Sequence, residues 1–61
     1  MDKDQITLNQ FRAFKRLRNR GIINMNDIVT GARLCKITEE AYETIMWNYR
    51  YLEEKFNPKE F

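Results

Sequence analysis

The chain has 61 residues, which allows one domain and places a single hydrophobic core close to the minimum that offsets the entropy of ordering the backbone. It holds 11 Lys and Arg against 9 Asp and Glu, with one cysteine and no histidine, so it has neither an internal disulfide nor the commonest general base. No apolar run approaches the roughly 18 residues that span a bilayer, and residues 1–4 lack the pattern of a signal peptide. We therefore expect one domain over residues 1–61, located in a reducing cytoplasm.

The first predicted helix spans residues 8–20. Thr7 and Gln10 have the spacing of a capping box, in which each side chain accepts a hydrogen bond from the other residue's backbone N–H group. Three apolar residues then recur at helical spacing: Phe11, Phe14 and Leu17. Gly21 supplies the left-handed residue that commonly ends a helix.

A second helix is predicted over about residues 25–35. Asn24 is a favourable N-cap, and Asp27 would then lie in the positive first turn. Four residues form the expected buried stripe: Ile28, Val29, Ala32 and Cys35. Gly31 costs about 1 kcal/mol relative to alanine inside a helix, so this helix should be short.

The third predicted helix runs from about residue 39 to residue 56. Thr38 is a good N-cap, and the two glutamates that follow it favour the positive end of a helix. One continuous apolar stripe follows: Tyr42, Ile45, Tyr49, Leu52 and Phe56. Pro58 then stops the helix. The sequence therefore predicts an all-α, compact three-helix domain with a long C-terminal helix, in which the first five residues and the tail after Pro58 are loose.

Charge is segregated along the chain. Residues 11–36 contain seven basic residues against one acid, whereas residues 37–61 contain six acids against three basic residues. Five of the basic residues belong to the first predicted helix: Arg12, Lys15, Arg16, Arg18 and Arg20. Such a face neutralises phosphates, docks on an acidic protein, or is simply solvated. All three interpretations stay open at this stage.

Residues 28–45 also have the apolar spacing of a helix-turn-helix. Its characteristic positions are Ala32, Ile37, Tyr42 and Ile45. Two features oppose DNA recognition, because Lys36 stands where the turn usually has glycine and the second helix opens with acids. These acids are Glu39, Glu40 and Glu43. They would repel the phosphate backbone, and a helix pair used only for packing has the same pattern.

The last predicted helix carries more large side chains than one buried stripe needs. Trp47, Arg50 and Tyr51 lie off that stripe, and these residue types are enriched at binding hot spots. One hypothesis is a partner-binding or homodimerisation patch. The alternative is that a small bundle buries Trp47 in its core.

The sequence offers no catalytic, cofactor-binding or metal-binding residues. Cys35 lies on an apolar face, where cysteine behaves as a small buried hydrophobe. The three glutamates that open the last helix are explained by the helix dipole. We therefore expect a binding protein and not an enzyme.

Two motifs resemble those of very small bacteriophage proteins. Residues 18–27 are similar to a G-x-x-N-M-x-D signature of short phage proteins, and residues 36–45 resemble the G-x-I-T-x-E-x-Y-x-x-I stretch of XkdX-type tail-region proteins. Cys35 replaces the glycine of the second motif. The resemblance covers about residues 11–49, and it implies a phage or prophage origin and a bacterial host cell.

A phage origin implies stoichiometric binding, since small phage proteins commonly occlude a host or defence protein, regulate transcription or assemble into virions. The preferred hypothesis is an accessory protein or inhibitor that binds a host or phage protein. A small helix-turn-helix DNA-binding regulator is the alternative, so nucleic acid stays a candidate partner. A virion or tail-assembly component is the third hypothesis, and no membrane partner is expected.

Overall fold

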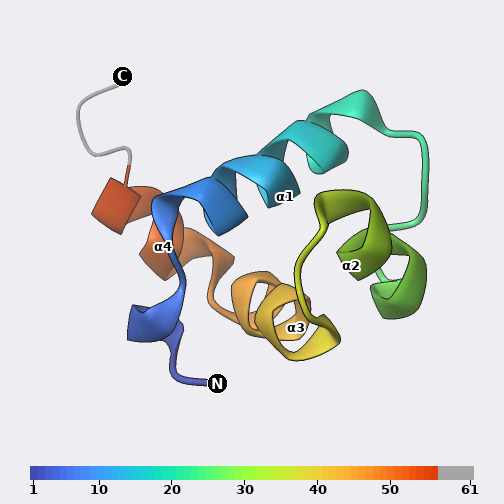
Figure 1. The fold of residues 1–61 in the computed structure, drawn as a ribbon. Coiled ribbons are helices and arrows are strands. Elements are labelled where there is room, and N and C mark those ends of the chain that lie inside the picture. The colour runs from blue at the N-terminus through green and yellow to red at the C-terminus, as the bar shows by residue number, and fades with distance from the viewer. Residues whose placement is uncertain (57–61) are drawn as a thin grey trace.

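The computed structural model describes residues 1–56, which form four α-helices and one short 3-10 helix (Figure 1). The elements are η1 (Lys3–Gln5), α1 (Leu8–Arg20), α2 (Ile28–Cys35), α3 (Glu39–Trp47) and α4 (Tyr49–Phe56). No strand occurs in this part of the chain, so the all-helical prediction is confirmed for it. The prediction of three helices with one long C-terminal helix is wrong.

Capping side chains fix the starts of both η1 and α1. Asp2 and Gln5 form a capping box around η1, which differs from the loose segment expected for the first five residues. The bounds predicted for α1 are confirmed. The Gln10 N–H group donates to Thr7 Oγ1 over 3.2 Å, and Gly21 ends the helix at a φ of 63°.

The second helix begins three residues later than predicted. Asp27 is its N-cap, and its Oδ1 atom accepts a hydrogen bond from the Thr30 N–H group. Asn24 instead forms a turn, in which its Oδ1 atom accepts from the Asn26 N–H group over 3.0 Å. An asparagine side chain stabilises a turn as readily as a helix start. Asn24 therefore caps the turn, and Asp27, which directly precedes the apolar stripe, caps the helix.

The predicted third helix is divided at Asn48, whose φ of −122° and ψ of 27° are not helical. The Asn48 side-chain amide donates to the Thr44 carbonyl over 2.9 Å. Asparagine side chains compete in this way with the regular helical ladder. The break gives α4 a direction of its own, beside the N-terminal half of α1 (Figure 1).

The core forms where α1 meets the other helices. Its buried residues are Ile6, Phe11, Phe14, Leu17, Ala32, Cys35, Ala41, Tyr42, Ile45 and Leu52. From α4, the rings of Tyr49 and Phe56 lie 5.4 and 5.6 Å from the ring of Phe11. The residues of the apolar stripe predicted over 42–56 therefore pack in or against the core, but they lie on two helices and not on one. Val29 departs from the predicted stripe of α2, since it is 52% exposed.

Candidate partner-binding surfaces

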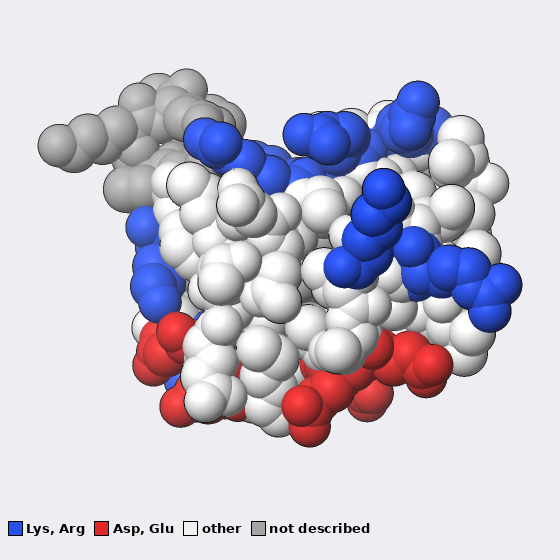
Figure 2. Space-filling model, viewed as in Figure 1, with Lys and Arg blue, Asp and Glu red and all other residues white. Residues whose placement is uncertain are grey.

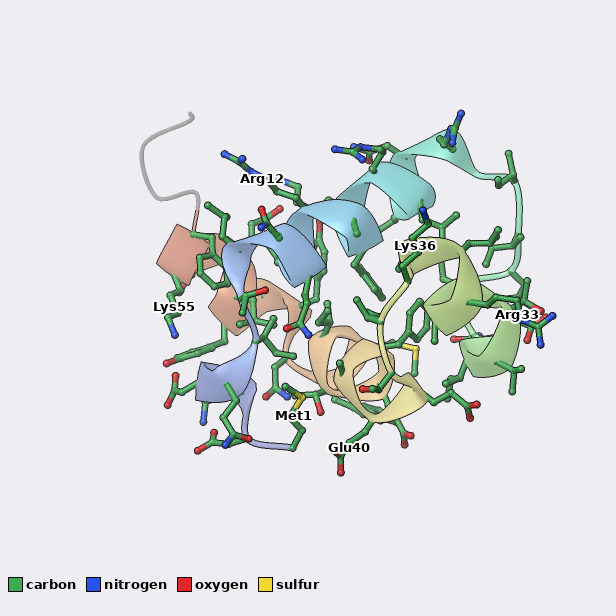
Figure 3. The ribbon with its side chains drawn as sticks, in the orientation of Figure 1. Met1, Arg12, Arg33, Lys36, Glu40 and Lys55 are labelled. Carbon is green, nitrogen blue, oxygen red and sulfur yellow. The ribbon has the colours of Figure 1, made fainter. Side chains whose placement is uncertain are left out.

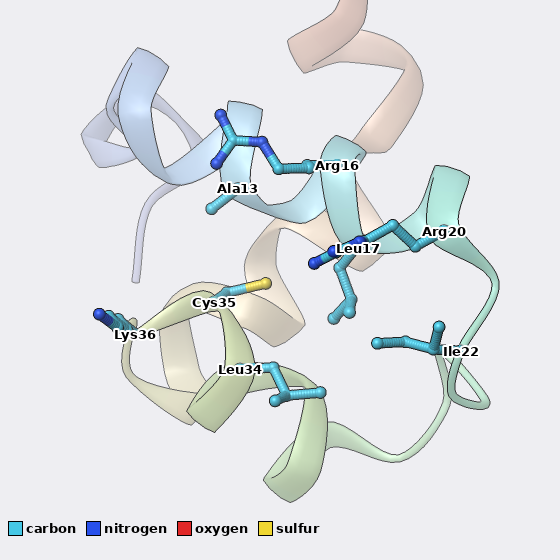
Figure 4. A pocket seen from close by; sticks show the side chains of 8 residues that line it. All are labelled: Ala13, Arg16, Leu17, Arg20, Ile22, Leu34, Cys35 and Lys36. Carbon is cyan, nitrogen blue, oxygen red and sulfur yellow. The ribbon is translucent and has the colours of Figure 1, made fainter.

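A groove of about 280 Å³ lies between α1, α2 and the loop that joins them (Figure 4). Its lining includes Arg16, Leu17, Arg20, Ile22, Leu34 and Lys36. Ile22 and Leu34 are 60% and 50% exposed, which is unusual for large aliphatic side chains that face each other across one hollow. We call this feature the α1–α2 groove. It combines an exposed apolar floor with a basic rim.

The rim of the α1–α2 groove is electrostatically unbalanced. Arg16, Arg20 and Lys36 are exposed, and no ion pair joins any of them to a carboxylate within residues 1–56. Figure 2 shows Lys and Arg gathered over α1 and α2, with Asp and Glu along the opposite edge of the molecule. The charge segregation seen along the chain is thus also a segregation in space, and it gives the groove a positive field.

The structure does not bring all five basic residues of α1 to this groove. Arg18 turns toward α4, where its Nη1 atom donates to the Tyr49 hydroxyl over 3.3 Å and its guanidinium lies 4.8 Å from the ring centroid. The ammonium of Lys15 lies 5.9 Å from the centroid of the Phe11 ring. Figure 3 shows Arg12 nearer the α4 end of α1, apart from Lys36. Only Arg16 and Arg20 of the predicted set line the groove.

Trp47 is the most exposed large hydrophobic side chain in residues 1–56, with 75% of its surface accessible. Trp47 therefore lies on the surface, and the alternative that a small bundle buries it in the core is wrong. Trp47 lines a shallow hollow together with Met1, Glu40, Glu43 and Thr44. The spacing of residues 40, 43 and 47 puts both acids on the same face of α3 as the indole. We call this the Trp47 surface.

Arg50 and Tyr51 belong to α4, beyond the break at Asn48. The Tyr51 hydroxyl donates to Asp4 Oδ1 over 2.5 Å, and the Lys3 ammonium lies 5.0 Å from the Tyr51 ring centroid. This hydrogen bond lowers the pKa of the Asp4 carboxyl and raises the pKa of the Tyr51 hydroxyl. Tyr51 thus holds the N-terminal turn, whereas Arg50 is exposed.

The turn between α2 and α3 passes through a left-handed residue. Lys36 adopts a φ of 59° and a ψ of 40°, the left-handed conformation for which glycine is usually selected. The Ile37 N–H group donates to the Ala32 carbonyl over 3.1 Å, which closes the turn. Glu39, Glu40 and Glu43 are exposed at the start of α3. The turn therefore contains a left-handed residue, as the turn of a helix-turn-helix does, but the surface charge at the start of α3 opposes DNA.

The groove residues that sequence patterns did not identify as partner-binding include Ile22, Leu34 and Lys36. One signal was available for Leu34, since it is a leucine outside the predicted stripe of α2. No sequence signal places Ile22 or Lys36 opposite α1, because that depends on the path of the loop and the turn.

Burial raises the pKa of the Cys35 thiol above its ordinary value of 9.0. At about pH 8 we expect the folded protein to react with a thiol reagent at least roughly tenfold more slowly than the unfolded chain. The protonated thiol also stabilises the folded state, and this contribution is lost as the pH rises above 9.0, where the unfolded chain ionises first. Timed thiol titration with and without urea measures the first effect. Equal rates in the two conditions would contradict the buried position.

None of the helices in residues 1–56 combines the length and the apolar character that crossing a bilayer requires. The same residues contain no cluster of three or more Cys, Asp or Glu side chains placed to hold a metal ion. Comparisons with protein-family models, with curated proteins and with solved structures give no match for this chain.

Proposed function

We propose that this chain acts stoichiometrically, by binding an acidic protein partner in the α1–α2 groove. The observation that supports this most is one hollow that combines two exposed aliphatic side chains with three cations that form no ion pair within residues 1–56. An apolar centre with a charged rim is the usual anatomy of a protein–protein interface. A surface that only contacts phosphates has no need of exposed Ile22 and Leu34.

The resemblance to small phage proteins extends this proposal to a biological role. A phage accessory protein that occludes a host or defence protein needs one surface of high affinity and no catalytic group. The α1–α2 groove is the surface to which we assign that contact. The partner is then a protein of the bacterial cytoplasm or of the phage itself, and the action is inhibition by occupancy.

A small DNA-binding regulator is the second candidate, and the left-handed Lys36 turn between α2 and α3 favours it. The glutamates at the start of α3 weigh against it, because the second helix of this motif presents its N-terminal residues to DNA. We therefore rank protein binding first. A DNA complex of this chain would show affinity that falls steeply with salt.

The test is affinity capture from a bacterial lysate with tagged full-length protein, with and without nuclease. The double variant Arg16→Glu/Arg20→Glu should reduce recovery of a nuclease-resistant partner by roughly tenfold or more, since it places like charges against an acidic surface. Arg12→Glu is the matched control, because it reverses a charge on the same helix outside the groove. Circular dichroism confirms that each variant remains helical.

Three outcomes decide between the candidates. Loss of the partner in the double variant and retention in Arg12→Glu supports docking in the groove. Equal losses in both variants would indicate general attraction to charge and overturn the groove. Recovery of nucleic acid alone, with every associated band removed by nuclease, would favour the DNA-binding regulator.

A further inference from the structure

The Trp47 surface is chemically complementary to the α1–α2 groove of the same chain. One presents an indole that is 75% exposed beside Glu40 and Glu43, and the other presents exposed aliphatic side chains beside three cations. The Trp47 surface therefore offers an exposed aromatic side chain with acidic neighbours, and the α1–α2 groove offers a hollow with basic neighbours. Such pairing of an aromatic anchor with a pocket and a charged rim is typical of specific interfaces.

The size of the groove also fits a single large side chain. At about 280 Å³ it lies at or below the lower limit of roughly 300 Å³ for pockets that bind small molecules. An indole occupies much of such a space and buries up to about 250 Å² of its surface when it is enclosed. The aliphatic floor of Leu17, Ile22 and Leu34 provides the apolar contact that an indole requires.

The two surfaces cannot meet within one molecule. Trp47 ends α3 and does not line the groove. Figure 3 shows Glu40 projecting from the edge of the molecule opposite Arg12, with Lys36 between them on the near face. Contact between the Trp47 surface and the groove therefore needs a second copy.

We propose that copies of this chain associate head to tail, with Trp47 of one copy seated in the α1–α2 groove of the next. Glu43 faces the cations of the rim, and it forms no ion pair within residues 1–56 of its own copy. Glu40 contributes less, because its carboxylate lies 3.3 Å from the Met1 amino group. The groove is the one assigned to the acidic partner, so self-association and partner binding compete, but neither requires the other.

The interface is heterologous, because different surfaces of the two copies meet. Such contacts leave a free groove at one end and a free Trp47 surface at the other, so they extend to chains or close into rings. The described protein exposes 4477 Å², and a transient interface buries less than about 600 Å² per partner. We therefore expect reversible association that grows beyond dimers as the concentration rises and that weakens with salt.

The experiment is sedimentation velocity of purified full-length protein over a range of concentrations. Trp47→Ala removes the anchor and should weaken association roughly 30-fold, which is the effect of losing one hot-spot residue. Arg16→Glu/Arg20→Glu should abolish association by reversing the rim. Val29→Ala and Arg12→Glu are the controls for exposed apolar surface and for charge, and both should associate like the unmodified chain.

Mixing the two defective variants gives the decisive measurement. Trp47→Ala keeps an intact groove and Arg16→Glu/Arg20→Glu keeps an intact Trp47, so the mixture should form one complex of two chains that cannot grow. A mixture that stays monomeric while the unmodified chain associates would overturn the proposed contact. An unmodified chain that stays monomeric up to about 1 mM, where even a weak Kd is detected, would overturn self-association.

These outcomes are separate from those of the lysate experiment. Loss of a captured partner in Arg16→Glu/Arg20→Glu together with a strictly monomeric chain would leave the proposed function standing and reject head-to-tail assembly. Association of the pure protein without any captured partner would support head-to-tail assembly and reject the proposed function. It would then favour an assembly role for the chain.

Discussion

Gly31→Ala should destabilise the protein by about 2 kcal/mol, although alanine is the better helix former. A Cβ atom at residue 31 would overlap the ring and hydroxyl of Tyr42. That ring is fully buried and cannot simply move aside, because Phe14 packs on it at 5.0 Å and its hydroxyl donates to the Met25 carbonyl over 2.7 Å. Overpacking of this kind costs about 1–3 kcal/mol and strains a partly buried hydrogen bond. The cost outweighs the gain of about 1 kcal/mol in helix propensity.

Urea unfolding followed by circular dichroism measures this change. Gly21→Ala is an informative control, since Gly21 has a φ of 63° and an added Cβ there would meet nothing within 4 Å. Its cost of about 1 kcal/mol or more comes from the backbone alone. In a Tyr42→Phe background the cost of Gly31→Ala should fall only in part, because the hydroxyl is removed but the ring carbons Cζ and Cε2 still occupy the space of the added Cβ. A stabilising Gly31→Ala would show that Tyr42 does not pack against α2 in this way.

Leu52→Ala should cost about 2–5 kcal/mol, the range for truncating a fully buried leucine. Leu52 is 0% exposed and is the buried residue of α4. A single hydrophobic core in a domain of this size rarely supplies more than about 3–5 kcal/mol of net stability. We therefore expect this variant to be largely unfolded at room temperature. The result would show that α4 stabilises the protein through the burial of Leu52.

Leu34→Ala is the matched comparison for Leu52→Ala. Leu34 is 50% exposed, so the same truncation should change the free energy of unfolding by less than about 1 kcal/mol. It should nevertheless weaken binding in the α1–α2 groove, which separates a folding role from a binding role. Similar unfolding energies for the two variants would contradict the packing of α4.

The local sequence determined three helix ends: the start and end of α1 and the start of α3. The capping residues act within three or four residues of the backbone groups that they cap, so their effect can be predicted without a tertiary structure. They are Thr7 with Gln10, Gly21 and Thr38. The charge imbalance of α1 is equally local, and two of its five basic residues, Arg16 and Arg20, line the groove. The pattern of apolar residues from Tyr42 to Phe56 also correctly identified which side chains meet the core.

Tertiary packing decided the rest. Periodicity alone does not show whether an apolar stripe lies on one straight helix or on two, and Asn48 broke the helix where a change of direction brings Tyr49 and Leu52 to the core. The exposure of Trp47, which the sequence left open, follows from that break and from the side of α3 that faces solvent. Lys36 lies across the groove from Arg16 and Arg20 because the loop over residues 21–27 returns α2 to the side of α1, a relation between distant residues that no local pattern contains.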